Sequence, residues 1–292
     1  MNWDDLRFLV VIGREGTLAA ASRRLKVDQT TVARRLRALE RTLGATLFER
    51  DAGRWLPTAV GRGVLERAAR IEEDVVSVVR AAEAGADTVS GVVRITSVSA
   101  IISGYLTARL PELYARHPEL VVALLASNEN LNVSRREADI AIRLARPPAG
   151  DFLIRKLAEC GFATYGPARE DVHARPGDWV AYLEDLAHTP EMRWLDSQLR
   201  GGRIRLRSNS LGVLAQAVAN GIGCGILPCF IADRHPGLER LDPAQPAVTR
   251  DLWLLTHREA RRQARVAAAA DWLVERFEAD AAGFRGRRAP RS

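Results

Sequence analysis

The sequence predicts a multidomain α+β fold, because three kinds of pattern follow one another along its 292 residues. Two short amphipathic helices separated by a tight turn are expected at residues 17–43. A heptad pattern follows at residues 64–82, and near-continuous apolar strands alternate with helices from residue 92 onward. We therefore expect a small helical N-terminal domain, a long helix and a C-terminal α/β part.

The helix pair at residues 17–43 is typical of a DNA reader. Thr17 and Asp28 are predicted to cap the two helices, with Lys26 in the turn between them. The second helix has one apolar face, made of Val32, Leu36, Leu39 and Leu43. Its other faces carry Gln29, Thr30, Thr31, Ala33, Arg34 and Arg37. Arg pairs bidentately with guanine and Gln with adenine, so this helix is expected to enter a major groove. A solvated basic face is the alternative interpretation.

A hairpin is predicted directly after the helix pair. Gly44 should end the second helix, and two short apolar pieces flank Asp51, Ala52 and Gly53. Arg50 and Arg54 would then lie where a hairpin tip reaches phosphate or the minor groove. A solvated tip without DNA contact is the alternative interpretation.

A long helix is predicted from Thr58, its N-cap, to about Ala84. Its apolar positions repeat with heptad spacing and consist of Val64, Ala68, Ile71, Val75, Val78 and Ala82. A seam of this length usually packs on another helix, which favours dimerisation over burial on its own small domain.

The chain beyond a hinge at residues 85–91 predicts a parallel sheet covered by helices on both faces. The expected strands lie at residues 92–97, 120–125, 139–143, 152–165 and 251–256. Ser99 is expected to cap one helix, a second helix is expected from Asn209 to Asn220, and a final helix covers residues 259–277. Residues 281–292 contain four Arg and no Asp or Glu, which indicates a disordered basic tail.

Charge and cysteine content exclude several classes of protein. Residues 1–62 hold 12 Arg and Lys against 7 Asp and Glu, which favours an anionic partner for the N-terminal part. No apolar run is long enough to span a membrane and the N-terminus is not a signal peptide, so a cytoplasmic location is expected. Cys160, Cys224 and Cys229 lack metal-type spacing, and we interpret them as small buried apolar residues rather than a redox pair.

The N-terminal 63 residues resemble the winged helix-turn-helix domain of LysR-type transcriptional regulators. The resemblance rests on three segments, LRFLVVIGREGTLAAASRRL, VDQTTVARRLRALERTLGATLFER and PTAVGRG. Many members have Ser-Gln-Pro where this chain has Asp28-Gln29-Thr30, and Ser where it has Ala33. These positions are expected to touch DNA, so the base preference of relatives does not transfer.

The resemblance covers nearly the whole chain and implies its domain organisation. It implies a C-terminal two-lobed α/β domain similar to periplasmic binding proteins, which binds an effector. The expected domains are a winged helix-turn-helix at 1–63, a linker and dimerisation helix with hinge at 58–90, an effector-binding domain at 91–280 and a basic tail at 281–292. Within the effector-binding domain, lobe I is expected at about 91–161 and 256–280, and lobe II at about 162–255.

An effector site is predicted between the lobes, at the carboxyl ends of the strands. Polar and small residues gather at strand ends or helix starts: Ser97, Ser99, Ala100, Asn128, Arg143, Ser208, Asn209 and Ser210. Helix N-termini at Ser99 and Ser210, together with the Arg143 charge, favour a small anionic effector. Each Ser or Asn alternatively serves as a cap only, and Arg143 alternatively forms a structural ion pair.

The sequence therefore predicts a DNA-binding transcriptional regulator and no enzyme, since it holds no nucleophile elbow, P-loop or metal motif. The expected DNA-binding residues are Thr17, Gln29, Thr30, Thr31, Ala33, Arg34, Arg37, Arg50 and Arg54. The expected partners are double-stranded DNA, a second copy in a homodimer with a homotetramer left open, the effector and, for an activator, RNA polymerase. No membrane, metal or cofactor is expected. An enzyme tethered by its N-terminal domain and an architectural DNA binder are the alternatives.

Overall fold

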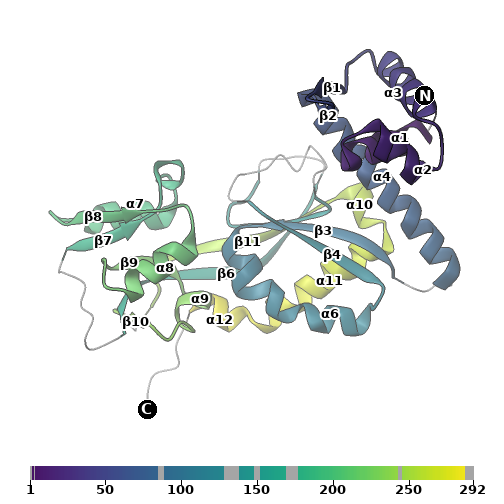
Figure 1. Ribbon diagram of the computed structural model, residues 1–292. Coiled ribbons are helices and arrows are strands. Elements are labelled where there is room, and N and C mark those ends of the chain that lie inside the picture. The colour runs from purple at the N-terminus through teal and green to yellow at the C-terminus, as the bar shows by residue number, and fades with distance from the viewer. Residues whose placement is uncertain are drawn as a thin grey trace. The chain divides into compact units, whose positions relative to one another are not determined.

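The computed structural model describes residues 2, 4–84, 89–127, 138–147, 152–168, 177–242 and 245–286, without the side chains of 73, 74 and 76–84. The chain forms two compact units, residues 1–91 and 92–292 (Figure 1). Within the described residues, no helix combines the length and apolar character that a membrane crossing requires.

The described residues of the N-terminal unit form four helices and a hairpin: α1 Asp4–Glu15, α2 Leu18–Leu25, α3 Gln29–Leu43, β1 Phe48–Asp51, β2 Arg54–Pro57 and α4 Ala59–Ala84. The predicted helix pair is confirmed, because the Thr17 hydroxyl accepts a hydrogen bond from the Ala20 N–H at 3.2 Å. Lys26 has a φ of 55°, a left-handed conformation that ends α2 before the turn to α3. Asp28 occupies the N-cap position of α3, as predicted, but its side chain makes no capping hydrogen bond. Its backbone carbonyl, rather than its carboxylate, accepts the N–H groups of Thr31 and Val32.

The predicted hairpin is confirmed, and we call β1, β2 and their turn the wing. Asp51 pairs with Arg54, so only two residues form the turn. Ala52 and Gly53 both have positive φ values, 45° and 82°. A two-residue hairpin turn of this kind matches the right-handed twist of its strands, and Gly adopts the conformation without a steric cost.

Helix α4 begins where predicted, since the Thr58 hydroxyl accepts the Gly61 N–H at 2.9 Å. The structure contradicts the predicted dimer contact at one seam residue, Ala68, and the other seam positions stay a prediction. Ala68 is 2% exposed within the N-terminal core, and Val64 and Ile71 pack against that core. Helix α4 lies against α1, because Gly13 has no side chain where Leu65 packs. Val75 is exposed, whereas the side chains of Val78 and Ala82 lie outside the described ones.

The second unit is built around a seven-stranded sheet in the order β10-β6-β11-β5-β3-β4, with β9 also paired to β6. Its strands are β3 Gly91–Ser97, β4 Leu120–Ala126, β5 Ile140–Arg143, β6 Phe152–Pro167, β9 Gly225–Pro228, β10 Leu238–Arg240 and β11 Val248–His257. A separate pair consists of β7 Asp178–Ala181 and β8 Arg203–Arg207. The helical segments are α5 Ser99–Ile101, η1 Ile102–Leu106, η2 Thr107–Arg109, α6 Leu110–Arg116, η4 Glu184–Leu186, α7 Pro190–Gln198, α8 Leu211–Ala219, α9 Cys229–Ala232, α10 Arg258–Arg261, α11 Ala264–Ala279 and α12 Ala281–Arg285.

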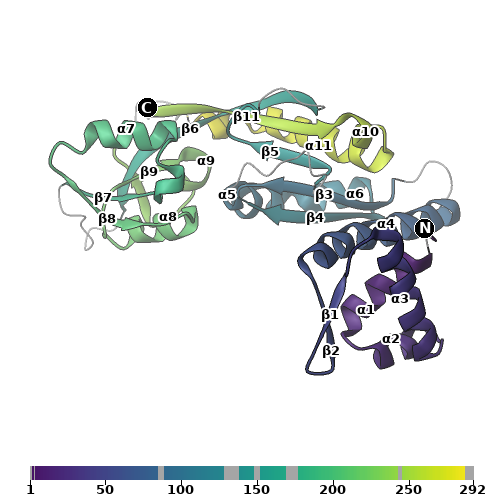
Figure 2. The same ribbon diagram turned by 90° about the horizontal axis from the view of Figure 1, so that it is seen from above.

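The sheet is mixed, so the prediction of a parallel sheet is only partly right. Strands β3 and β5 are parallel, but β11 runs antiparallel to both β5 and β6. The antiparallel pairing arises because the chain crosses between two lobes on β6 and returns on β11. Figure 2 shows these two strands running between a lobe with α7, α8 and β7–β9 and a lobe with β3–β5 and α11. We call the lobe with β3–β5 lobe I and the other lobe II.

Three local predictions in this unit need correction. Ser99 does not cap a helix but is the first residue of α5, after Val98 at the cap position. The final helix is divided into α10 and α11, with Gln263 at the break. Residues 281–285 are not part of a tail but form α12, because Phe284 is buried at 1% exposure against the aromatic rings of Tyr105, Phe277 and Phe230.

Candidate functional sites

Helix α3 presents a polar face to solvent because its apolar face closes the N-terminal core. Val32, Leu36 and Leu39 are buried, as their spacing predicts, whereas Leu43 at the end of the same predicted face is exposed. Gln29, Thr30, Arg34 and Arg37 are exposed, while Thr31 and Ala33 are half-buried. Thr17 lies at the start of α2, where its hydroxyl is occupied as the cap.

The arginines of α3 have different surroundings. Arg35 donates to Asp5 at 2.9 Å and lies over the Phe8 ring, so it fastens α3 to α1. Arg34 and Arg37 have no ion-pair or hydrogen-bond partner among the residues that the structure describes. Their guanidinium groups are therefore available to an external anion or base edge.

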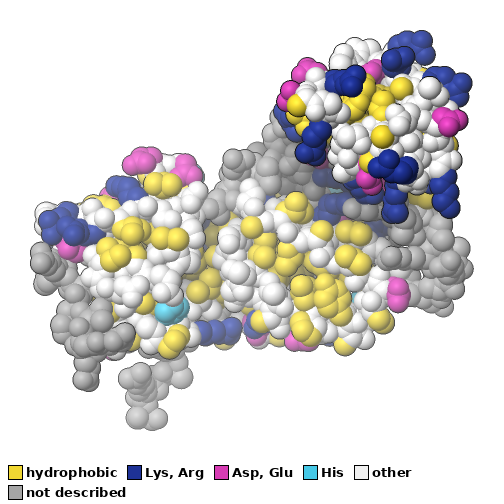
Figure 3. Space-filling model, viewed as in Figure 1, with side chains coloured by type: hydrophobic (Ala, Val, Ile, Leu, Met, Phe, Trp, Pro, Cys, Tyr) yellow, Lys and Arg dark blue, Asp and Glu magenta, His cyan; other side chains and the backbone are white. Residues whose placement is uncertain are grey.

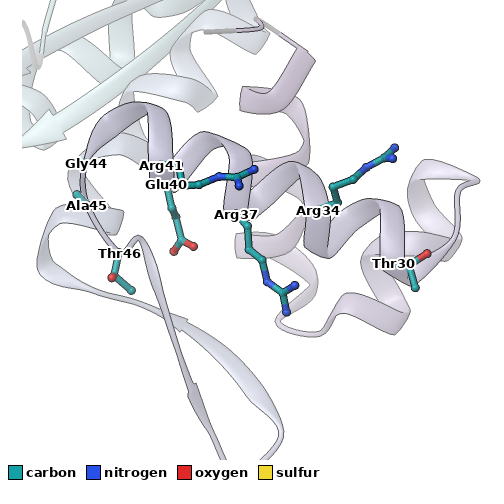
Figure 4. Close-up of a pocket in the computed structure, with 8 residues that line it drawn as sticks. All are labelled: Thr30, Arg34, Arg37, Glu40, Arg41, Gly44, Ala45 and Thr46. Atoms are coloured by element: carbon teal, nitrogen blue, oxygen red, sulfur yellow. The ribbon is translucent and has the colours of Figure 1, made fainter.

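An open hollow of 660 Å³ lies beside α3. It is lined by Thr30, Arg34, Arg37, Glu40, Arg41, Gly44, Ala45 and Thr46. In Figure 4 the Glu40 side chain points from α3 toward the chain at Thr46. The Glu40 carboxylate accepts the Leu47 N–H at 2.8 Å, which fixes the start of the wing relative to α3. Sequence reasoning missed Glu40, Arg41 and Thr46. Glu40 was missed because its bond to Leu47 joins positions seven apart, which leaves no periodic pattern.

Both arginines predicted at the wing are exposed. Arg50 is on β1 and Arg54 is the first residue of β2. The Arg54 guanidinium lies over Gly16, where even a Cβ atom would come within 3.2 Å of it. Trp55 N–H also donates to the Gly16 carbonyl at 2.8 Å, so the wing is anchored on the turn before Thr17. Figure 3 shows Lys and Arg side chains spread over the visible face of this unit.

A cavity of 560 Å³ lies within the second unit, bounded by both lobes. Lobe I contributes the chain that follows β3, β4 and β5, at Val98–Ile101, Ser127 and Arg143–Ala145. Lobe II contributes the segment between β7 and α7 and the starts of α8 and α9. Cys160 and Phe162 on β6 and Arg250 on β11 line it from the crossing strands.

The cavity brings together only some of the predicted effector residues. Ser99, Ala100, Arg143 and Asn209 line it. Ser97 does not, because its hydroxyl is buried and donates to the Ile142 carbonyl. Ser208 accepts the Ser210 N–H, and neither residue lines the cavity. Asn128 lies outside the described residues.

Arg143 is a buried cation in the cavity wall. It is 6% exposed and donates to the Ile142 carbonyl and the Thr96 hydroxyl, both at 3.1 Å. Its Nε has no hydrogen-bond partner and no carboxylate pairs with it among the described residues, so a structural ion pair is not seen there. Burial lowers the pKa of Arg143, since the low-dielectric surroundings disfavour its charge.

Sequence reasoning missed a second charged group in the cavity wall. Glu191 on α7 accepts a hydrogen bond from Arg250 on β11 at 2.8 Å, although the two residues are far apart in sequence. Cys160 also lines the cavity, and burial raises the pKa of its thiol. Burial likewise raises the pKa of Cys224 and Cys229, which favours inert thiols. The described residues hold no metal-ligand cluster.

Two family profiles match this chain. Residues 3–62 match "Bacterial regulatory helix-turn-helix protein, lysR family", and residues 86–278 match "LysR substrate binding domain". The "Mau operon transcriptional activator" of Paracoccus denitrificans is 34% identical over 285 residues, covering 97% of this chain and 99% of that protein.

Solved structures share the fold. The crystal structure of full-length CbnR complexed with the target DNA aligns with a TM-score of 0.67 at 19% identity, covering 95% of this chain and 100% of that one. A full-length OxyR variant from Pseudomonas aeruginosa aligns with a TM-score of 0.61 at 20% identity, covering 99% of this chain and 100% of that one.

Proposed function

Because the chain belongs to the LysR family of DNA-binding transcriptional regulators, with a helix-turn-helix and an effector-binding domain, we propose how its residues divide the work. Gln29 and Arg34 read base edges in the major groove. Arg37, Arg50 and Arg54 bind phosphates, and Thr17, Thr30, Thr31 and Ala33 complete the contact surface. The observation that supports this assignment is the exposed face of α3, on which Arg34 and Arg37 lack partners among the described residues.

The proposed regulator responds to a small anionic effector bound in the cavity between the lobes. The observation that carries this proposal is Arg143, a buried guanidinium in the cavity wall without an acidic partner in the described part of the chain. A buried charge without a counterion is unfavourable, so an anionic ligand would be stabilised there.

Effector binding is proposed to act through the geometry of a dimer. An effector that touches both cavity walls shifts the relative position of the lobes. In a dimer, that shift changes the spacing of the two helix-turn-helix domains on their two DNA half-sites. Val64, Ile71, Val75, Val78 and Ala82 of α4 are the proposed dimer contacts, with a homotetramer as a further state to test. Such a regulator acts in the cytoplasm, and an activator would also contact RNA polymerase.

The DNA assignment is tested by capturing genomic fragments with the full-length protein at near-physiological salt, where non-specific binding is weak. Enrichment of a few sites with two half-sites is expected. Arg34→Ala should then cost about 1–3 kcal/mol at one base position, whereas Arg37→Ala should weaken cognate and random DNA alike. Arg193→Ala, an exposed change on α7, is the charge control. Equal weakening of both DNAs by Arg34→Ala would contradict base reading.

A further inference from the structure

The effector cavity contains a buried acceptor as well as a buried cation. Glu191 is 1% exposed and lines the cavity from the first turn of α7. Its Oε1 accepts from Arg250, whereas its Oε2 has no hydrogen-bond partner among the described residues. Because a buried carboxylate oxygen without a donor is costly, this oxygen is a site for a donor supplied from outside the chain.

The charges of the cavity are divided between its two walls. Arg143 lies on the lobe I wall, at the end of β5. Glu191 and the exposed carboxylate of Asp185 lie on the lobe II wall. Arg250 lies between the walls and is already used, since it donates to Glu191 at 2.8 Å and to the Leu144 carbonyl at 3.4 Å. Within the part of the chain that the structure describes, a ligand therefore meets a cation without an acidic partner on one wall and carboxylate oxygens without a donor on the other.

We propose that the effector is amphoteric: a small carboxylate that also carries a protonated amine. This inference rests on the proposed anionic effector and narrows its chemical class. The carboxylate pairs with Arg143, and the ammonium donates to Glu191 and Asp185. The carbon body between them contacts the apolar part of the lining, which includes Ile101, Phe162, Leu211, Pro228 and Phe230.

An amphoteric ligand has a property that singly charged ligands lack, because it joins the two lobes by charge-assisted hydrogen bonds at both ends. A plain carboxylate leaves the Glu191 oxygen without a donor. A plain amine leaves Arg143 without a counterion. One charge-assisted hydrogen bond corresponds to an affinity change of about tenfold to hundredfold, so the second contact should be measurable.

The test measures binding of matched compounds to the full-length protein by calorimetry and thermal shift. Each set holds one carbon skeleton as carboxylate, amine and amino acid, for example pentanoate, pentylamine and 5-aminopentanoate, with 2-aminopentanoate as the second spacing. We expect an amino acid of at least one set to bind about tenfold or more tightly than its carboxylate, and the amine to bind weakest. Arg143→Gln should weaken the carboxylate and the amino acid together.

Variants on the lobe II wall separate this inference from the proposed function. Glu191→Gln should remove the advantage of the amino acid over the carboxylate of the same set, and this ratio of affinities is the quantity compared because the variant also frees Arg250. Asp185→Asn is the second variant, at an exposed side chain, and keeps the test available if the buried Glu191→Gln change prevents folding. It should reduce the same advantage of the amino acid over the carboxylate. Glu184→Gln is the matched control, because this neighbouring carboxylate is 82% exposed and does not line the cavity.

Three outcomes would overturn the inference. Carboxylates that bind in an Arg143-dependent way with no gain from the amine would leave the anionic effector standing and sink the amphoteric one. Amino acids that bind the Glu191→Gln and Asp185→Asn variants as tightly as the parent protein would also contradict the amphoteric effector and leave the anionic effector standing. Absence of binding by every carboxylate and amino acid would contradict the anionic effector itself.

Discussion

The Glu40 carboxylate accepts a hydrogen bond from the Leu47 N–H at 2.8 Å, so a side chain of the recognition helix holds the residue that leads into the wing. Glu40→Ala leaves this N–H without a partner beside a fully buried Leu47 side chain. We expect a loss of about 1–3 kcal/mol in the free energy of unfolding, measured by urea titration of the full-length protein. DNA affinity should fall for all sequences alike.

Glu49→Ala is the control for Glu40→Ala, because Glu49 is an exposed carboxylate on β1. It removes the same charge near the DNA-binding face without touching the wing junction. Equal effects of the two substitutions would assign the loss to charge rather than to the hydrogen bond.

Gly61 and Gly63 form a matched pair on α4. A Cβ at Gly61 would overlap the Leu47 carbonyl oxygen, a backbone atom that cannot turn aside. Gly61→Ala is therefore expected to destabilise the N-terminal unit by about 1–3 kcal/mol or more. Gly63→Ala meets only the Arg67 Nη1 atom, at 3.4 Å, and should stabilise the helix by about 0.5–1 kcal/mol. Calorimetric melting distinguishes them, and a shift of the same sign in both would contradict the steric argument.

Phe284 connects the two lobes through aromatic contacts. Its ring centroid lies 4.7 Å from Tyr105 on η1 and 4.6 Å from Phe230 on α9. We expect Phe284→Ala to cost about 3–5 kcal/mol in the free energy of unfolding, because it leaves a cavity in the core. A chain ending at Asp280 should lose similar stability. A chain ending at Gly286 keeps α12 and is the control, and an equal Tm for both truncations would contradict this role of α12.

Asp280 makes stability depend on pH. Burial acts to raise the pKa of Asp280, but hydrogen bonds from Arg109 at 2.7 Å and Tyr105 at 2.9 Å outweigh it and hold the pKa below its ordinary value. The stabilisation is therefore present above the unfolded pKa of about 3.9 and is lost as pH falls through the lower folded value. Asp280→Asn should lower Tm at neutral pH, and its Tm should converge with that of the parent protein in acid. Glu278→Gln, at an exposed ion pair, should show no such convergence.

The N-terminal unit was largely predictable because its determinants are local. Thr17 caps α2 within three residues, and Val32, Leu36 and Leu39 report the buried face of α3 by spacing alone. At Asp28 the sequence predicted the N-cap position of α3 but not its hydrogen bonds. A residue type that favours N-caps does not show which of its oxygens accepts the first N–H groups of the helix. The assignment of Ala68 to a dimer seam failed because heptad spacing does not say which apolar surface covers it.

The effector cavity was predictable mainly on the lobe I side, with Asn209 as the predicted lining residue of lobe II. Ser99 and Arg143 follow apolar strands, which sequence patterns locate. Glu191 and Arg250 meet only because β11 returns between β5 and β6, and no local pattern encodes that return. Two charged residues in amphipathic surroundings look like solvated ones until the fold buries them.

The position of β11 in the sheet determines when the second unit can complete its fold during synthesis of the chain. In the described sheet, β11 (Val248–His257) lies between β5 and β6 and pairs with both. A growing chain on the ribosome can therefore complete its DNA-binding unit after about a third of translation, since domains generally fold from the N-terminus as they emerge. The effector-binding unit acquires β11, which lies between β5 and β6, only near the end of translation. A prematurely terminated product would thus carry a folded DNA-binding unit followed by an incomplete sheet. Its unpaired strand edges would make it prone to aggregation.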